Sequence, residues 1–187
     1  MTSTPSANAQ AGSGPAALAA DGPAADRDGE MMLFGQFVGD WDVDFTVYGP
    51  DGTRQTEKAE WHFGWVLEGR AVQDVWIVPR RGERDKASPV PRDYGTTIRF
   101  YDPAIDAWRV VYASPVHGDL LTFVARRVGD EIVLEGRDPE GSPMRWIFSE
   151  ITGKSFRWRR VVSTDGGKTW QLHKEMSVRR AEQPQEL

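Results

Sequence analysis

A two-residue alternation of apolar and polar side chains between Val38 and Tyr48 constrains the fold of this chain more than any other feature. Every second residue from Trp41 to Val47 is apolar, and acidic residues or threonine fill the positions between. A strand places successive side chains on opposite faces, whereas a helical period would scatter both sets around the axis. The segment therefore predicts a strand with one face in a core.

The same alternation recurs along the rest of the chain, in segments separated by short turns such as GPDG at 49–52 and DGG at 165–167. A short apolar segment at 31–37 predicts a helix, and a charged, proline-broken segment at 79–91 predicts a long loop. Consecutive hairpins form a meander, and closing a meander removes both exposed edges. The sequence therefore predicts an all-β fold, a single antiparallel up-and-down barrel of about ten strands with a short N-terminal helix.

The composition divides the chain into three parts. Residues 1–29 consist largely of Ala, Gly, Pro, Ser and Asp, and contain too little apolar surface to pack on a barrel. We therefore expect a disordered N-terminal tail at 1–29, the barrel at 30–181 and a C-terminal tail at 182–187.

Charge and composition disfavour several functional classes. The net charge of −5 provides no basic surface for nucleic acid or an anionic membrane. No segment approaches 18 uncharged apolar residues, and the Ala-rich stretch at 16–20 is too short for a secretory signal. The absence of cysteine fits a reducing compartment. These features predict a cytoplasmic protein without nucleic-acid or membrane partners, and they leave a homodimer open.

The pair Gly39 and Trp41, preceded by a short helical segment, resembles the lipocalin and fatty-acid-binding-protein group of calycin barrels. In that group the Trp lies at the closed end and an Arg of the final strand packs across it, which implies this role for Arg180, or else Arg179. The segments GRAVQDVW (69–76), IRFYDP (98–103) and STDGGKTW (163–170) are similar to a bacterial lipocalin-like family whose members are mostly of unknown function. The resemblance thus implies a calycin barrel in which Gly39, Trp41 and Arg180 are structural.

The parity of the predicted strands directs a set of aromatic and polar side chains into the barrel. Buried charges are costly unless they are paired, so polar groups there form a network, face water at the open end, or bind a ligand. Fatty-acid-binding barrels hold a carboxylate with an Arg and a Tyr, which implies that Tyr112 and Arg126 do the same. The predicted ligand-binding residues are Trp76, Trp108, Tyr112, Arg126, Trp146, Phe148, Trp158 and Arg160.

These residues favour a protein that binds a small, largely apolar molecule in a Trp-lined cavity. An enzyme on the same barrel, such as a cyclase or isomerase of a small hydrophobic substrate, is the alternative, with Asp74 or Tyr112 as the acid or base. A barrel filled by its own side chains would act through its surface instead. The observation that separates these readings is whether Asp74, Tyr112 and Arg126 point into one open space.

The histidines predict neither a metal site nor a cofactor. His62, His117 and His173 are spread over two strands and a loop, and His62 and His173 have the parity of solvated side chains. A haem-binding barrel of the nitrobindin kind stays open because His173 lies in the final strand. It is disfavoured because Val43 stands where that group would show Gly and because His173 has outward parity.

Overall fold

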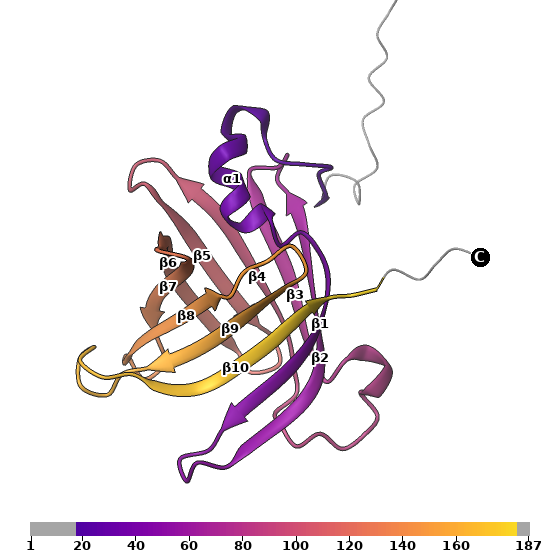
Figure 1. Ribbon diagram of the computed structural model, residues 1–187, viewed down its shortest axis with the longest axis vertical. Coiled ribbons are helices and arrows are strands. Elements are labelled where there is room, and N and C mark those ends of the chain that lie inside the picture. The colour runs from indigo at the N-terminus through magenta and orange to yellow at the C-terminus, as the bar shows by residue number, and fades with distance from the viewer. Residues whose placement is uncertain (1–17, 183–187) are drawn as a thin grey trace, which may run out of the picture.

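The computed structural model describes residues 18–182, in which ten strands close into a single antiparallel barrel (Figure 1). Each strand pairs with the next along the chain, and the last pairs with the first, so that neither has a free edge. This confirms the predicted lipocalin-like barrel. The strands are β1 (Gly39–Tyr48), β2 (Arg54–Val66), β3 (Ala71–Val78), β4 (Asp93–Asp102), β5 (Ala107–Ser114), β6 (Asp119–Val128), β7 (Glu131–Arg137), β8 (Pro143–Ser149), β9 (Ser155–Val162) and β10 (Gln171–Arg180).

Strand β1 has the two faces that its alternation predicts. Trp41, Val43 and Phe45 are at most 4% exposed, while the residues between them are more accessible. The apolar face lies in the core because burial of these side chains removes apolar area from water.

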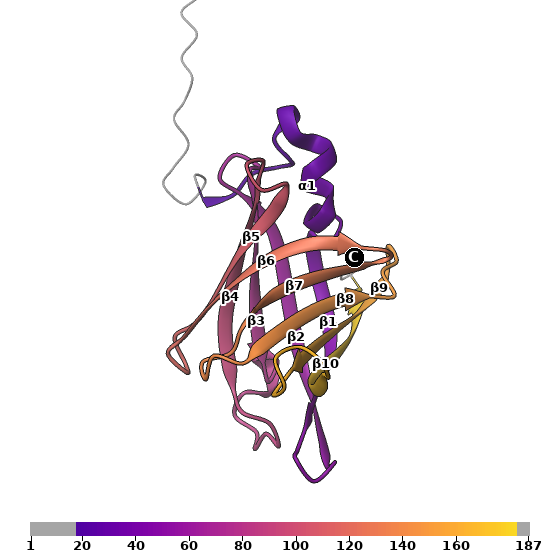
Figure 2. The same cartoon turned by 90° about the vertical axis from the view of Figure 1, so that its left-hand side faces the viewer.

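A short helix, α1 (Asp28–Gly35), lies at one end of the barrel (Figures 1 and 2). Its Phe34 ring packs edge-on against Trp108, with the ring centroids 5.0 Å apart, and also contacts Phe148. Phe37, just after the helix, packs on Phe156 at 4.7 Å. An aromatic layer therefore seals this end. No helix within residues 18–182 has both the length and the apolar character needed to cross a membrane.

Arg180 lies across Trp41, as the family resemblance implies. Its guanidinium carbon is 4.1 Å from the indole centroid, and the indole Nε1 donates a hydrogen bond of 2.7 Å to the Phe37 carbonyl. Arg180 Nη1 also donates to the Val38 carbonyl at 3.0 Å. Gly39 has a φ of +125°, and a Cβ built there would lie 2.5 Å from Arg180 Nη1. Gly39 is thus required by both backbone conformation and the approach of the arginine.

The segment just before the helix contacts the barrel, which contradicts a tail extending to residue 29. The Ala20 amide donates to the Trp65 carbonyl at 2.9 Å, and the Ala24 amide donates to the Gly69 carbonyl at 3.1 Å. Backbone hydrogen bonds, two small alanine side chains and an ion pair between Asp26 and Arg70 hold this segment, so its composition gave little sign of it. Residues 1–17 and 183–187, which belong to the tails expected at 1–29 and 182–187, lie outside the described residues.

A chain that begins at residue 28 is expected to unfold at a lower temperature than one that begins at residue 18. Removal of this segment loses two backbone hydrogen bonds to the barrel, each worth about 0.5–1.5 kcal/mol. Differential scanning calorimetry should show a loss of several degrees. Equal midpoints would show that these contacts do not stabilise the barrel.

Candidate ligand-binding site

A cavity lies between the strands and the loop that joins β3 to β4. This loop is at the end of the barrel away from α1 (Figure 1). The volume within the cavity that the centre of a water molecule can occupy is ≈ 90 Å³. Because one water needs roughly 10–15 Å³ by this measure, the lumen is not completely filled by side chains. The larger hollows are grooves on the outer face, lined by outward residues such as Leu120 and Val124.

Aromatic side chains form much of the cavity wall. The indoles of Trp146 and Trp158 meet at 5.3 Å between ring centroids, and those of Trp61 and Trp76 meet at 5.9 Å. The Nε1 groups of Trp61, Trp146 and Trp158 are buried without a hydrogen-bond partner among the described residues. The wall is therefore largely apolar, and three of the tryptophans that form it have a buried donor without a partner. Its main apolar residues are Phe45, Trp61, Trp76, Trp146, Trp158 and Met176.

Two cations on neighbouring strands line one side of the cavity. Arg160 of β9 and Lys174 of β10 are directly paired in register. Neither forms an ion pair with a carboxylate in the described part of the chain, and Arg160 Nε is buried without a partner. Burial lowers the pKa of Arg160, and burial together with Arg160 lowers the pKa of Lys174. This side of the cavity therefore presents positive charge without a protein counter-ion in contact.

Acidic and phenolic groups come from β4, β5 and β6, which lie across the closed barrel from β9 and β10. The Tyr112 hydroxyl donates to Asp93 Oδ2 at 2.5 Å, and the Ser114 hydroxyl donates to Asp93 Oδ1 at 2.6 Å. Burial, assisted by the Asp93 carboxylate, raises the pKa of Tyr112, so the phenol keeps its proton. His117 and Asp119 line the cavity beside this cluster. The site thus has a cationic side and an acidic side.

Most of the predicted ligand-binding residues face the lumen, but at different depths. Trp108 and Phe148 point inward and belong to the aromatic layer beneath α1 rather than to the cavity wall. The predicted residues that do line the cavity are Trp76, Tyr112, Trp146, Trp158 and Arg160.

The prediction that Arg126 faces the lumen is wrong. Its side chain is exposed on the outer face of β6 and donates to the Ile105 carbonyl at 3.3 Å. Leu121 points inward at 8% exposed, whereas Leu120 is 71% exposed. Two adjacent leucines allow either parity for the strand, and the protein has the one that places Leu121 in the core and Arg126 outside. Arg126 therefore does not partner Tyr112.

Asp74, a candidate acid or base of the enzyme alternative, does not share an open space with Tyr112. Asp74 Oδ2 lies 2.5 Å from Arg99 Nη2, and both side chains are 0% exposed. The Arg99 guanidinium carbon is 5.2 Å from the ring centroid of Phe34 and 5.4 Å from that of Phe63. This buried ion pair does not line the cavity, so Asp74 cannot act there as an acid or base.

Sequence reasoning missed several residues of the site and its surroundings. Arg99 was missed because apolar residues of β4, such as Ile98 and Phe100, lie on the face opposite to it, although an inward Asp74 called for a cation nearby. Lys174 had the correct inward parity but was not included among the predicted ligand-binding residues. Asp93, His117 and Asp119 lie at strand ends and in a turn, where alternation carries little information.

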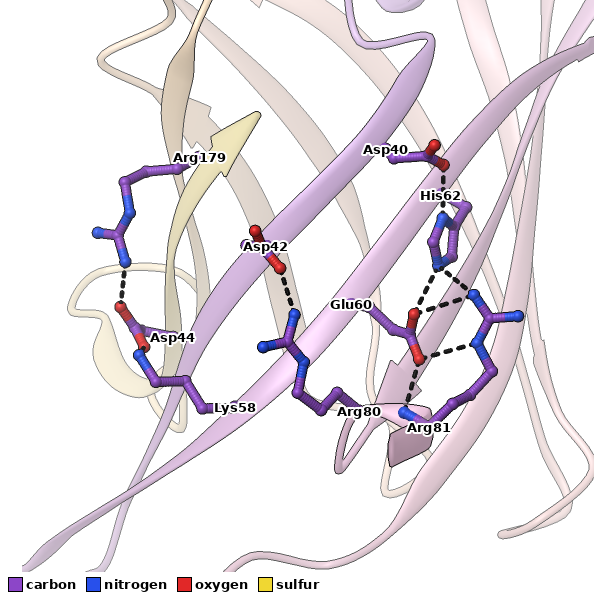
Figure 3. A network of polar contacts seen from close by, with 9 residues as sticks. All are labelled: Asp40, Asp42, Asp44, Lys58, Glu60, His62, Arg80, Arg81 and Arg179. Atoms are coloured by element: carbon purple, nitrogen blue, oxygen red, sulfur yellow. Dashed lines mark hydrogen bonds and ion pairs between the residues drawn. The ribbon is translucent and has the colours of Figure 1, made fainter. Parts of the chain in front are cut away.

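His62 lies in a charged network on the outer face of β1 and β2 and is not simply solvated (Figure 3). Its Nδ1 is 2.6 Å from Asp40 Oδ1, and its Nε2 is 3.0 Å from Glu60 Oε2. Partial burial disfavours the ionised form of Glu60, but hydrogen bonds from Arg81 outweigh it and lower the pKa of Glu60 to about 2. Arg81 belongs to the loop before β4, so the network fixes this loop to the barrel. Within residues 18–182, no three His, Asp or Glu side chains are grouped to hold a metal ion.

Comparison with known proteins supports the fold. The sequence matches no protein-family model and no curated protein. The S-type phycobiliprotein lyase CPES from Guillardia theta has a similar structure, with a TM-score of 0.55 and 9% identity over 81% of this chain and 92% of that chain. Rv2717c from M. tuberculosis has a TM-score of 0.53 and 13% identity over 82% and 98% of the two chains. At these identities, the likeness shows that the chain has the ten-stranded lipocalin-like fold.

Proposed function

We propose that the barrel binds one small, largely apolar molecule that carries a hydrogen-bond acceptor, in the cavity away from α1. The observation that carries this proposal is an open, aromatic space whose lining residues include buried donors without a partner. The indole Nε1 groups of Trp61, Trp146 and Trp158 and the Nε of Arg160 are buried without partners in residues 18–182.

Unused buried donors are costly. A buried polar group without a partner costs roughly 1–3 kcal/mol, and more if it is charged. A ligand carbonyl or carboxylate would supply acceptors for these donors, while its apolar part would pack on the tryptophan rings. The cavity is small, so the part of the ligand inside it is small as well.

The acceptor end of the ligand is directed toward Arg160 and Lys174 rather than toward Tyr112. The Tyr112 hydroxyl already donates to Asp93, whereas the two cations have no carboxylate in ion-pair contact. A guanidinium can also donate two parallel hydrogen bonds to a carboxylate. Arg160 therefore binds the ligand's carboxylate or carbonyl oxygen, the role that the resemblance to fatty-acid-binding barrels implied for Arg126.

The alternatives have less support. A reaction in this cavity would have to use Tyr112 with Asp93 in place of Asp74, which is sealed with Arg99. A haem ligand from the final strand is disfavoured because His173 does not line the cavity. The structural likeness to a phycobiliprotein lyase supports the fold alone.

Arg160→Met is expected to weaken the binding of naphthoic acid by about 1.5–3 kcal/mol, because the substitution keeps much of the stem and removes a charged donor. This corresponds to roughly 10- to 150-fold in Kd. Tryptophan emission can report the titration, since the indoles line the cavity. Binding of methylnaphthalene, which has no acceptor, should change little.

Arg126→Met is the matched control, because Arg126 is exposed on the outer face and lines no part of this cavity. This variant should bind naphthoic acid as the unaltered protein does. Equal weakening in both variants, or loss of acid and hydrocarbon binding alike in Arg160→Met, would contradict the proposed contact. Absence of any emission change with either probe would contradict the proposed function itself.

A further inference from the structure

Lys174 differs from the other lysines of the chain in its surroundings. The others lie at exposed strand or turn positions, and Lys58 and Lys86 contact the carboxylates of Asp44 and Glu83. Lys174 is the lysine that lines the cavity.

The Lys174 amine lies beside an aromatic ring and a second cation. Its Nζ is 5.8 Å from the centroid of the Phe45 ring, and Arg160 is its register partner on β9. No carboxylate in residues 18–182 lies within ion-pairing distance of it. An apolar wall and a neighbouring cation both disfavour the ammonium form, and a neutral amine is a nucleophile.

We propose that Lys174 forms an imine with the carbonyl group of a small apolar aldehyde or ketone, so that the barrel holds this class of ligand through a reversible covalent bond. This inference rests on the proposed function, because the same cavity must first admit the ligand. It adds the chemical class of the ligand and the atom that holds it.

The reaction needs no component beyond the amine and the carbonyl compound. The lone pair of neutral Nζ attacks the carbonyl carbon, a C–N bond forms, and the carbonyl oxygen takes up a proton to give a carbinolamine. Loss of that oxygen as water and of the remaining nitrogen proton leaves the C=N bond. The aldehyde and the lysine amine thus give one imine and one water, and no electrons are gained or lost overall. Arg160 is placed to donate to the carbonyl oxygen as charge develops on it.

The charged groups around the cavity set the pH dependence. Burial and Arg160 lower the pKa of Lys174, while Asp93 and Asp119 oppose them with smaller effects. Tyr112 keeps its proton, and His117 is the remaining titratable group in the lining. A lowered pKa increases the share of neutral amine at a given pH, so imine formation at Lys174 should begin at lower pH than at an exposed lysine.

Reductive trapping of the full chain tests this. The protein is incubated with naphthaldehyde at neutral pH and treated with borohydride, which reduces the imine to a stable secondary amine. The intact mass should then rise by the mass of the aldehyde less one oxygen atom. Peptide mapping should place the adduct on Lys174, at a rate several-fold above that at any exposed lysine, because Lys174 alone lines the cavity that holds the aldehyde. The α-amino group, with an ordinary pKa of about 8, is the natural competitor, and mapping distinguishes it.

Lys174→Met should abolish trapping within the barrel, and Lys174→Arg should do the same while keeping the charge. Lys168→Met is the matched control, because Lys168 lies in the exposed turn before β10 and lines no cavity. If a Lys174 variant fails to fold, the peptide map of the unaltered chain still shows whether the adduct lies on Lys174. Excess naphthoic acid should slow trapping at Lys174 by competing for the cavity.

The outcomes separate this inference from the proposed function. Emission changes with naphthoic acid, without any adduct at Lys174, would overturn the imine and leave ligand binding standing. Adducts confined to the α-amino group and exposed lysines would also overturn it. No binding of either the acid or the aldehyde would overturn both.

Discussion

Asp74→Ala is expected to lower the free energy of unfolding by about 3–5 kcal/mol, because it leaves the buried Arg99 guanidinium without its counter-ion. Arg99 is 0% exposed between the rings of Phe34 and Phe63, so water does not replace the lost carboxylate. The same change removes the acceptor of the Thr97 amide, which donates to Asp74 Oδ1 at 3.1 Å. Urea unfolding followed by tryptophan emission measures the loss.

Two controls show whether burial of the pair is the cause. Glu135→Ala breaks an ion pair with Arg145 that is exposed to solvent and should cost no more than about 1 kcal/mol. Replacing Asp74 with Leu together with Arg99 with Met should recover most of the loss, since apolar replacement of a buried pair is often neutral or stabilising. A cost for Asp74→Ala no greater than that for Glu135→Ala would show that the pair is not sealed from water.

Trp41→Ala is expected to cost about 3–5 kcal/mol, because a fully enclosed indole loses its packing shell. Arg180→Ala should cost less. A double-mutant cycle between the two should give a coupling of at least about 0.5 kcal/mol, since the guanidinium lies 4.1 Å from the indole centroid.

The matched comparison is Arg145 over Trp170, a similar contact at 4.3 Å near the surface. Trp170→Ala should cost much less than Trp41→Ala, because Trp170 is only partly buried. Additive effects of Trp41→Ala and Arg180→Ala would show that Arg180 contributes through its backbone carbonyl contacts instead, such as the one to Val38.

The sequence by itself determined the barrel. Alternation in β1, repeated over segments joined by short turns, leaves few arrangements other than an antiparallel meander, and a meander gains by closing. The positions of Gly39, Trp41 and Arg180 followed from a resemblance, and the close approach of Arg180 to Gly39 gives its physical reason.

Parity was sufficient where one face of a strand is clearly polar, as in β9, where Arg157 and Arg159 alternate with the inward residues and Arg160 lines the cavity. It failed in β6, where Leu120 and Leu121 are adjacent and either could face the core. A one-residue error in the predicted parity places every side chain of a strand on the wrong face. For this reason Arg126 was expected in the lumen, whereas it lies on the outer face.

Only the tertiary structure decided which inward groups share a space. Asp74 and Tyr112 both point inward, but Asp74 pairs with Arg99 in the sealed part of the barrel and Tyr112 bonds to Asp93 at the cavity. Alternation fixes the face of a strand and says nothing about depth along the barrel, which depends on the register of every neighbouring strand. The meeting of Lys174 with Arg160 follows from that register, because residues far apart in sequence become neighbours only when the last strands pair.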